Sequence, residues 1–284
     1  MSAKAALFVT LGGFTLFYLF IVVAAVRGGL GFKWPTGIQT AIGFVTNFFD
    51  TLGIGSFATT TSLFRFKGIV PDQLIPGTLN VGHTLPTVAQ AYIYTTIVEV
   101  DMATLIAMIA ASVAGAWLGA GIVAGWPARK VRIGMGFALL AAATLFLMTQ
   151  LNLFPKGGDT LDLQGSRLAL GVLGNFVLGA LMSLGIGLYA PCMILVSLLG
   201  MQPTAAFPIM MGSCAFLMPV GSARFVRTRS FHPQAAAGLG LGGIPAVLVA
   251  AFVVRSLPLE AVRVLVLGLA IWTGASLLLA ARRS

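Results

Sequence analysis

The chain has 284 residues, of which 58% are hydrophobic and only 8% charged. Ordinary soluble domains carry about 25% charged residues, so the composition excludes a soluble protein and predicts an all-α polytopic membrane protein. The formal charge of +10 would suggest nucleic-acid binding in a soluble chain. Here the basic residues stand in short clusters between apolar runs, which is typical of membrane orientation, so no nucleic-acid partner is expected.

Nine apolar segments long enough to enter a bilayer follow one another along the chain. The first is predicted to be a retained helix with its amino terminus outside, because it is long and the more basic residues follow it. The nine predicted segments are residues 5–26, 36–66, 73–97, 102–126, 130–151, 167–200, 204–226, 234–254 and 259–281.

An internal repeat relates the two halves of the chain. A shift of 132 residues aligns Phe44–Pro76 with Phe176–Pro208 and gives 11 identities in 33 positions, several of them glycine or proline. The same shift pairs four segments with four others and leaves the first helix unpaired. The predicted organisation is therefore an extra helix and loop (1–35), repeat 1 (36–151), an extracytoplasmic linker (152–166) and repeat 2 (167–284).

The basic residues indicate how the repeats cross the membrane. If all nine segments cross, the 17 Lys and Arg divide 8 against 9 between the two faces. If segments 36–66 and 167–200 are re-entrant, 12 of the 17 fall on one face, as the positive-inside rule requires. The expected fold is thus about seven full spans plus two re-entrant hairpins of broken helices, in inverted-topology repeats. The carboxyl terminus is then cytoplasmic.

The predicted hairpin tips carry the sequence Leu-Gly-Ile-Gly in both repeats, with glycines at Gly53, Gly55, Gly185 and Gly187. A helix that starts after such a break directs free N–H groups and the positive end of its dipole towards the protein centre. Two such ends that meet can bind an anion without a buried arginine. Hydroxyl, amide, imidazole and thiol groups nearby complete the predicted substrate-binding set, which adds Ser56, Thr59, Asn80, His83, Ser183, Tyr189 and Cys192. Thr60, Thr61 and Ser62 extend the hydroxyl-rich stretch.

Asp50 is the one acidic residue predicted inside a membrane segment. An intramembrane carboxylate is a functional candidate, and beside an anion it must be protonated to avoid repulsion. We therefore predict a proton-coupling role for Asp50, with His83 as a possible proton partner; the alternative is a structural carboxylate that caps backbone N–H groups. No metal or cofactor is expected, because Cys192 and Cys214 lack ligand spacing.

Several glycine motifs have a packing explanation. Gly115 and Gly119, Gly121 and Gly125, and Gly238 and Gly242 have the GxxxG spacing of close helix packing, within the chain or in a homodimer. Gly238, Gly240 and Gly243 match GxGxxG but follow no strand, which argues against a dinucleotide site. No hydrolase or nucleotide-binding motif is present, so neither an enzyme nor catalytic residues are predicted.

The duplicated break, LGIGSFATT…KGIVP and LGIGLYAPC…LGMQP, resembles the TauE/SafE family of sulfite and organosulfonate exporters. The resemblance covers nearly the whole chain after the first helix. It departs from the family pattern where Ser56 and Leu188 follow the second glycine, in place of a fuller glycine run. It implies a permease of the bacterial inner membrane that moves a small sulfur-containing anion and uses the proton gradient or the membrane potential.

The sequence thus predicts a secondary transporter of a small oxyanion such as sulfite or a sulfonate, working by alternating access. Three alternatives stay open: an uptake permease for a small carboxylate, a cation carrier that uses Asp50 as a ligand, and a membrane protein that does not transport. The direction of transport and the oligomeric state are left undecided.

Overall fold

The computed structural model describes residues 2–31, 33–153, 157–185, 187–252 and 259–282, and these residues form helices with no β-strand among them. The long helices are α1 (Ala3–Ala25), α2 (Gly37–Thr51), α3 (Phe57–Lys67), α4 (Ile75–Ile97), α5 (Met102–Val123), α6 (Ala128–Gln150), α7 (Gly165–Met182), α8 (Tyr189–Leu198), α9 (Ala206–Arg227), α10 (Pro233–Phe252) and α11 (Leu259–Arg282).

Within the described ranges, six helical stretches are long and apolar enough to cross a membrane: Ala3–Leu30, Met102–Val123, Ala128–Gln150, Gly165–Met182, Pro203–Arg227 and Pro233–Phe252. The chain is therefore an all-α membrane protein. Helix α4 is 23 residues long but is not one of the six. Its buried positions include Asn80, His83 and Gln90. Its hydropathy is therefore low because polar side chains face the interior of the protein.

Segments 36–66 and 167–200 are both broken, at the predicted glycines. Helix α2 ends at Thr51 and α3 begins at Phe57, while α7 ends at Met182 and α8 begins at Tyr189. Gly53 and Gly185, which are 132 residues apart, have φ values of +88° and +87°. Glycine adopts this left-handed conformation without a steric penalty, so the chain can leave the helix there and turn back.

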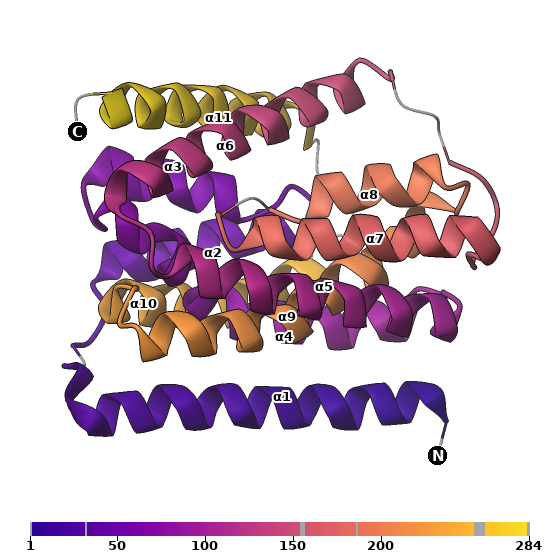
Figure 1. The fold of residues 1–284 in the computed structure, drawn as a ribbon, viewed down its shortest axis with the longest axis horizontal. Helices are drawn as coiled ribbons and strands as arrows, with labels where there is room; N and C mark the ends of the chain where they lie inside the picture. Colours follow the sequence, from indigo (N-terminus) through magenta and orange to yellow (C-terminus); the bar gives the residue numbers. More distant parts are fainter. Residues whose placement is uncertain (1, 32, 154–156, 186, 253–258, 283–284) are drawn as a thin grey trace.

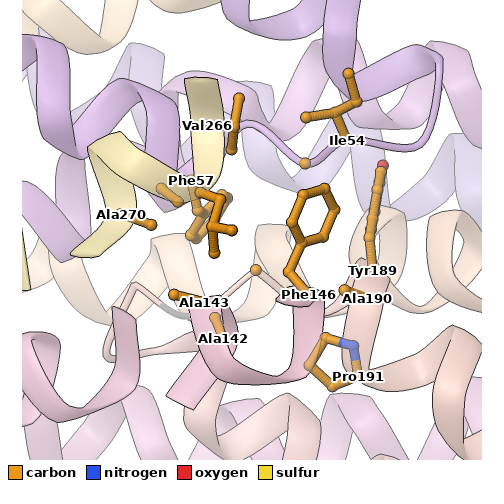
Figure 2. Close-up of a pocket in the computed structure, with 14 residues that line it drawn as sticks. Ile54, Phe57, Ala142, Ala143, Phe146, Tyr189, Ala190, Pro191, Val266 and Ala270 are labelled. Carbon is orange, nitrogen blue, oxygen red and sulfur yellow. The ribbon is translucent and has the colours of Figure 1, made fainter. Parts of the chain in front are cut away.

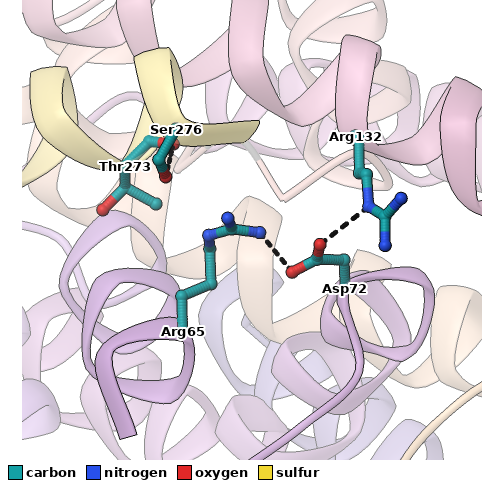
Figure 3. A network of polar contacts seen from close by, with 5 residues as sticks. All are labelled: Arg65, Asp72, Arg132, Thr273 and Ser276. Carbon is teal, nitrogen blue, oxygen red and sulfur yellow. Dashed lines mark hydrogen bonds and ion pairs between the residues drawn. The ribbon is translucent and has the colours of Figure 1, made fainter. Parts of the chain in front are cut away.

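Ion pairs next to the start of α4 connect the end of α3 to the start of α6. Asp72, three residues before α4, pairs with Arg65 on α3, and its other oxygen lies 2.8 Å from Nε of Arg132 at the start of α6. Figure 3 shows both arginines pointing to the one carboxylate. We call Arg65, Asp72 and Arg132 the ion cluster.

The start of α2 lies at this same end of the molecule. Gln234 at the start of α10 donates a hydrogen bond of 2.8 Å to the carbonyl of Trp34, and the N–H of His232 donates one of 2.9 Å to Thr78 in the first turn of α4. The α2–α3 pair therefore enters and leaves at one end, as a hairpin.

The α7–α8 pair enters and leaves at the other end. The N–H of Leu163, just before α7, donates to Thr104 at the start of α5 over 3.0 Å, and Thr160 in the same linker donates to the carbonyl of Gly200 after α8 over 3.0 Å. Since α4 crosses the molecule between its start and that of α5, the two hairpins come from opposite ends.

The first arm of each hairpin packs tightly on a helix of the other repeat. Helix α2 lies against α10, and α7 lies against α5. A Cβ on Gly115 would meet the Phe176 carbonyl oxygen at 1.9 Å, and a Cβ on Gly242 would meet that of Thr40 at 2.0 Å. The close packing predicted for Gly115/Gly119 and Gly238/Gly242 is confirmed, whereas Gly121 and Gly125 meet no other helix backbone.

Helices α6 and α11 pack on each other and form a layer along one side of the bundle, with α1 along the opposite side (Figure 1). The second arms, α3 and α8, lie under this layer: α3 contacts α11 and α8 contacts α6. Helix α1 begins and α11 ends at opposite ends of the long axis (Figure 1). Every one of these pairings has its counterpart at the repeat offset.

Candidate functional site

The two hairpin tips meet beneath the α6–α11 layer and border a partly open cavity of about 50 Å³, which we call the tip cavity. Its tip residues include Gly55 and Phe57 from the first hairpin and Gly187 and Tyr189 from the second. The layer contributes Ala142, Ala143, Phe146, Val266, Leu267 and Ala270. In Figure 2 the Phe146 ring projects between Ile54 and Pro191, so α6 covers the space between the tips.

A second, smaller cavity lies behind the tips, on the side of α4 and α9. This Asp50 cavity has a volume of only about 10 Å³, room for about one water molecule, and is bordered by Asp50, Ser56, Thr87, Met182, Leu188 and Cys214, together with the four tip residues Gly55, Phe57, Gly187 and Tyr189. Phe57 and Tyr189 are the first residues of α3 and α8 and are equivalent at the repeat offset. This aromatic pair therefore borders both cavities.

Asp50 is buried at the end of α2, in contact with groups from three other segments. Its Oδ2 accepts a hydrogen bond of 2.9 Å from Nε2 of Gln90 on α4. The Ser56 N–H and hydroxyl and the Tyr189 oxygen also lie next to the carboxylate. Ser56 is the N-cap of α3, so the carboxylate sits at the positive end of that helix. Among the described residues that border the two cavities, Asp50 is the only charged one.

His83 is fully buried on α4, and within the described residues it bonds to neither Asp50 nor any group of the second hairpin. Its Nδ1 lies 3.0 Å from Asn47 Oδ1, and its Nε2 lies 3.1 Å from Thr60 Oγ1. The Asn47 amide nitrogen donates to the Gly43 carbonyl, so its oxygen accepts from Nδ1 and leaves Nε2 to accept from Thr60. His83 thus ties α4 to both arms of the first hairpin. His83 and Asp50 therefore share no direct hydrogen bond through which the predicted proton exchange could occur.

The other predicted site residues divide between the tips and the packed interior. Gly53 and Gly185 form the breaks, and Thr59 donates to the Ser56 carbonyl within its own helix at 2.8 Å. Ser183 faces the Ala116 carbonyl of α5 at 3.5 Å, Asn80 donates to the Pro76 carbonyl at 2.9 Å, and Cys192 is fully buried in the hydrophobic core. None of these six residues borders either cavity.

Several residues that border the site or bond within it were not predicted, among them Phe57, Thr87, Gln90 and Phe146. Phe57 could have been found as the repeat equivalent of Tyr189. Gln90 had the signal of a buried amide inside a membrane segment, and its burial on α4 is complete. Thr87 and Phe146 gave no signal, since threonine and phenylalanine are ordinary in such segments.

The chemistry offered here is that of backbone and hydroxyl donors next to one carboxylate. Free N–H groups at the starts of α3 and α8 can donate to an oxyanion, and Tyr189 borders both cavities. In the described part of the chain, no three His, Cys, Asp or Glu side chains gather to hold a metal ion.

No model of a known protein family matches the chain, and a search of curated proteins finds no match. The function therefore has to be argued from the arrangement of the hairpins and the cavities.

Proposed function

We propose that this membrane protein is a secondary transporter of a small anion. The observation that carries the proposal is the meeting of two broken helices, from opposite ends of the molecule, at a pair of adjoining cavities. Inverted repeats with interrupted helices at a central site are a recurrent transporter architecture. Non-helical backbone at membrane depth is tolerated where it is buried or lines a cavity, which agrees with the tips bordering both cavities.

The proposed binding groups are the N–H donors that follow Gly55 and Gly187, with the Tyr189 hydroxyl beside them. The α6–α11 layer covers the tips, and in the proposed cycle this layer and the hairpin arms beneath it expose the site to one side at a time. The tip cavity borders Ala142–Phe146 of α6 and Val266–Ala270 of α11, which are the halves of these helices nearer the second hairpin's end. At the first hairpin's end, the ion cluster and the 2.7 Å hydrogen bond from Thr273 to Ser62 join α3 to the layer. This asymmetry supports a state that is closed at the first hairpin's end.

The proposed cargo is a sulfur-containing oxyanion such as sulfite or a sulfonate, carried out of a bacterial cell across the inner membrane. This finer statement depends on the resemblance to the TauE/SafE family. A small carboxylate would fit the same donors, so carboxylate uptake stays an alternative.

A second candidate function, cation transport, is favoured by one observation. In the part of the chain that the structure describes, Asp50 is the only charged side chain at the two cavities, and a carboxylate next to hydroxyl groups can hold a cation.

A flux assay in proteoliposomes tests the proposal. Labelled sulfite, methanesulfonate, acetate and sodium are offered to the wild-type protein and to Asp50→Asn. We expect the sulfur anions to move, and Asp50→Asn to keep anion binding while its transport no longer responds to pH. A cation carrier would instead lose sodium binding in Asp50→Asn. Failure of all four solutes to move would contradict a transporter of these classes, and movement of acetate alone would overturn the sulfur-anion assignment.

A further inference from the structure

Gln90 joins the two hairpins through the two ends of its amide group. Its Nε2 donates to Asp50 Oδ2 and to Thr51 Oγ1, both at 2.9 Å, and its Oε1 accepts from the Tyr189 hydroxyl at 2.7 Å. All four side chains are buried. The carboxylate of the first hairpin and the phenol of the second are thus connected through one rotatable group on α4, in addition to the direct approach of the Tyr189 oxygen to the carboxylate.

This connection breaks the symmetry of the repeats. The positions 132 residues after Asp50 and Gln90 are Met182 and Ser222, which cannot form the same bridge. The remaining titratable groups around Asp50 are the phenols of Tyr94 and Tyr189 and the thiol of Cys214. Within the described residues, the ion pairs belong to the ion cluster alone, so no lysine or arginine neutralises Asp50.

We infer that Gln90 is a positioning residue that makes hydrogen-bond donation by Tyr189 depend on whether Asp50 carries a proton. The inference rests on the proposed anion transport, and it adds the link between the proton and the anion.

With Asp50 ionised, the hydrogen-bond directions are those of the structure. The carboxylate only accepts, so Gln90 turns Nε2 towards it and Oε1 towards Tyr189. The one phenolic proton of Tyr189 is then held by acceptors on the Asp50 side. Tyr189 then has no proton left to donate to an anion in the tip cavity. The ionised Asp50 also repels the anion.

When a proton binds Asp50, the carboxylic acid becomes a donor. Rotation of the Gln90 amide lets Oε1 accept from the acid and Nε2 donate to the Tyr189 oxygen. The Tyr189 proton is released and can point into the tip cavity, where it donates to the anion. Proton and anion therefore bind together, and protonation also removes the negative charge behind the site.

Binding measurements on three variants test this wiring. The probe is methanesulfonate, because its own charge does not change between mildly acidic and mildly alkaline pH. The variants are Gln90→Met, which keeps the side-chain length and removes the amide, Tyr189→Phe, and Tyr92→Phe as the matched control. Tyr92 lies on the same helix α4 and donates to the Phe8 carbonyl at 2.9 Å, away from both cavities.

We expect the wild type and Tyr92→Phe to bind methanesulfonate more tightly at acidic pH. Tyr189→Phe should lose about tenfold in affinity at acidic pH, the equivalent of one hydrogen bond to a charged group, and change little at alkaline pH. Gln90→Met should bind about as weakly as wild type at alkaline pH, because the Asp50 carboxylate beside the Tyr189 oxygen still accepts its proton. At acidic pH it should lose most of the wild-type gain in affinity, because no amide N–H donates to the Tyr189 oxygen and frees its proton for the anion.

A merely structural role of Gln90 would instead weaken binding equally at both pH values, and that result would overturn the inference. So would an equal loss in Tyr189→Phe at both pH values. If the wild type binds no methanesulfonate at all, the proposed substrate class fails, and the wiring is tested without a ligand. The infrared carboxyl band that disappears in Asp50→Asn should change frequency in Gln90→Met, since its hydrogen-bond partner is gone; an unchanged band contradicts the bridge.

Discussion

Two neighbouring threonines on α3 have opposite surroundings. Thr60 bonds to His83 Nε2 at 3.1 Å, whereas the hydroxyl of Thr61 is buried without a hydrogen-bond partner. Both side chains are 0% exposed. A buried hydroxyl stabilises a fold only if it is paired, because removal from water costs free energy that the hydrogen bond must offset.

Replacement of each threonine by valine, which has nearly the same shape, should therefore have opposite effects. Thr60→Val leaves His83 Nε2 unpaired and should lower the free energy of unfolding by about 1 to 3 kcal/mol. Thr61→Val should leave it unchanged or raise it by about 1 kcal/mol. Thermal unfolding in detergent measures both. Equal destabilisation would mean that the Thr60–His83 contact contributes nothing specific.

Among the helices, the closest contacts join the first arm of each hairpin to the opposite repeat. Glycines of α5 meet the α7 backbone, and glycines of α10 meet α2. Such faces bring backbones together where lipid offers no hydrophobic driving force. They leave no room for sliding, so α2 with α10 and α5 with α7 should behave as fixed pairs.

Gly115→Ala tests one of these contacts. Its Cβ would lie 1.9 Å from the Phe176 oxygen, so α5 and α7 would have to separate, at a cost of about 1 to 3 kcal/mol. Gly13→Ala on α1 is the control, because a Cβ there meets nothing within 4 Å. We expect a lower melting temperature for Gly115→Ala alone. A similar melting temperature for both variants would contradict tight packing of this pair.

For the molecule as a whole, the decisive feature is that the hairpins enter from opposite ends. Lys33 precedes α2 and Lys67 ends α3, both exposed, while the exposed Arg167 lies in the first turn of α7 at the other end. In a bilayer, the first two positions should face one side and the third the other.

Single cysteines at these three positions, labelled in intact cells by a membrane-impermeant reagent, measure their sidedness. The native Cys192 and Cys214 are buried, so they give little background. Lys33→Cys and Lys67→Cys should be protected together, and Arg167→Cys should react. Opposite sides for the first two would exclude a first re-entrant hairpin.

The backbone of this fold could be predicted better than its site. The helix breaks follow from glycines repeated at a fixed offset, and Gly53 and Gly185 take the conformation that this pattern predicts. Ser183 and Cys192 were expected at the substrate path, but Ser183 faces α5 and Cys192 lies in the core. Side chains around these helices are apolar on nearly all sides, so sequence periodicity does not indicate which face turns to the centre. The Gln90 bridge depends on how α4 is rotated, which only the packing reveals.

The ion cluster has no counterpart at the repeat offset, where Ser197, Thr204 and Val264 stand in place of Arg65, Asp72 and Arg132. In a carrier made of two equivalent halves, the states open to either side would have the same free energy. Three charges at one mouth of the proposed carrier remove this equivalence, because they stabilise that closed mouth and the described residues form no such ion pairs at the other. Without substrate, the protein should therefore rest in the state that is open at the second hairpin's end. Each transport cycle must then supply the free energy that separates the ion cluster at the first hairpin's end.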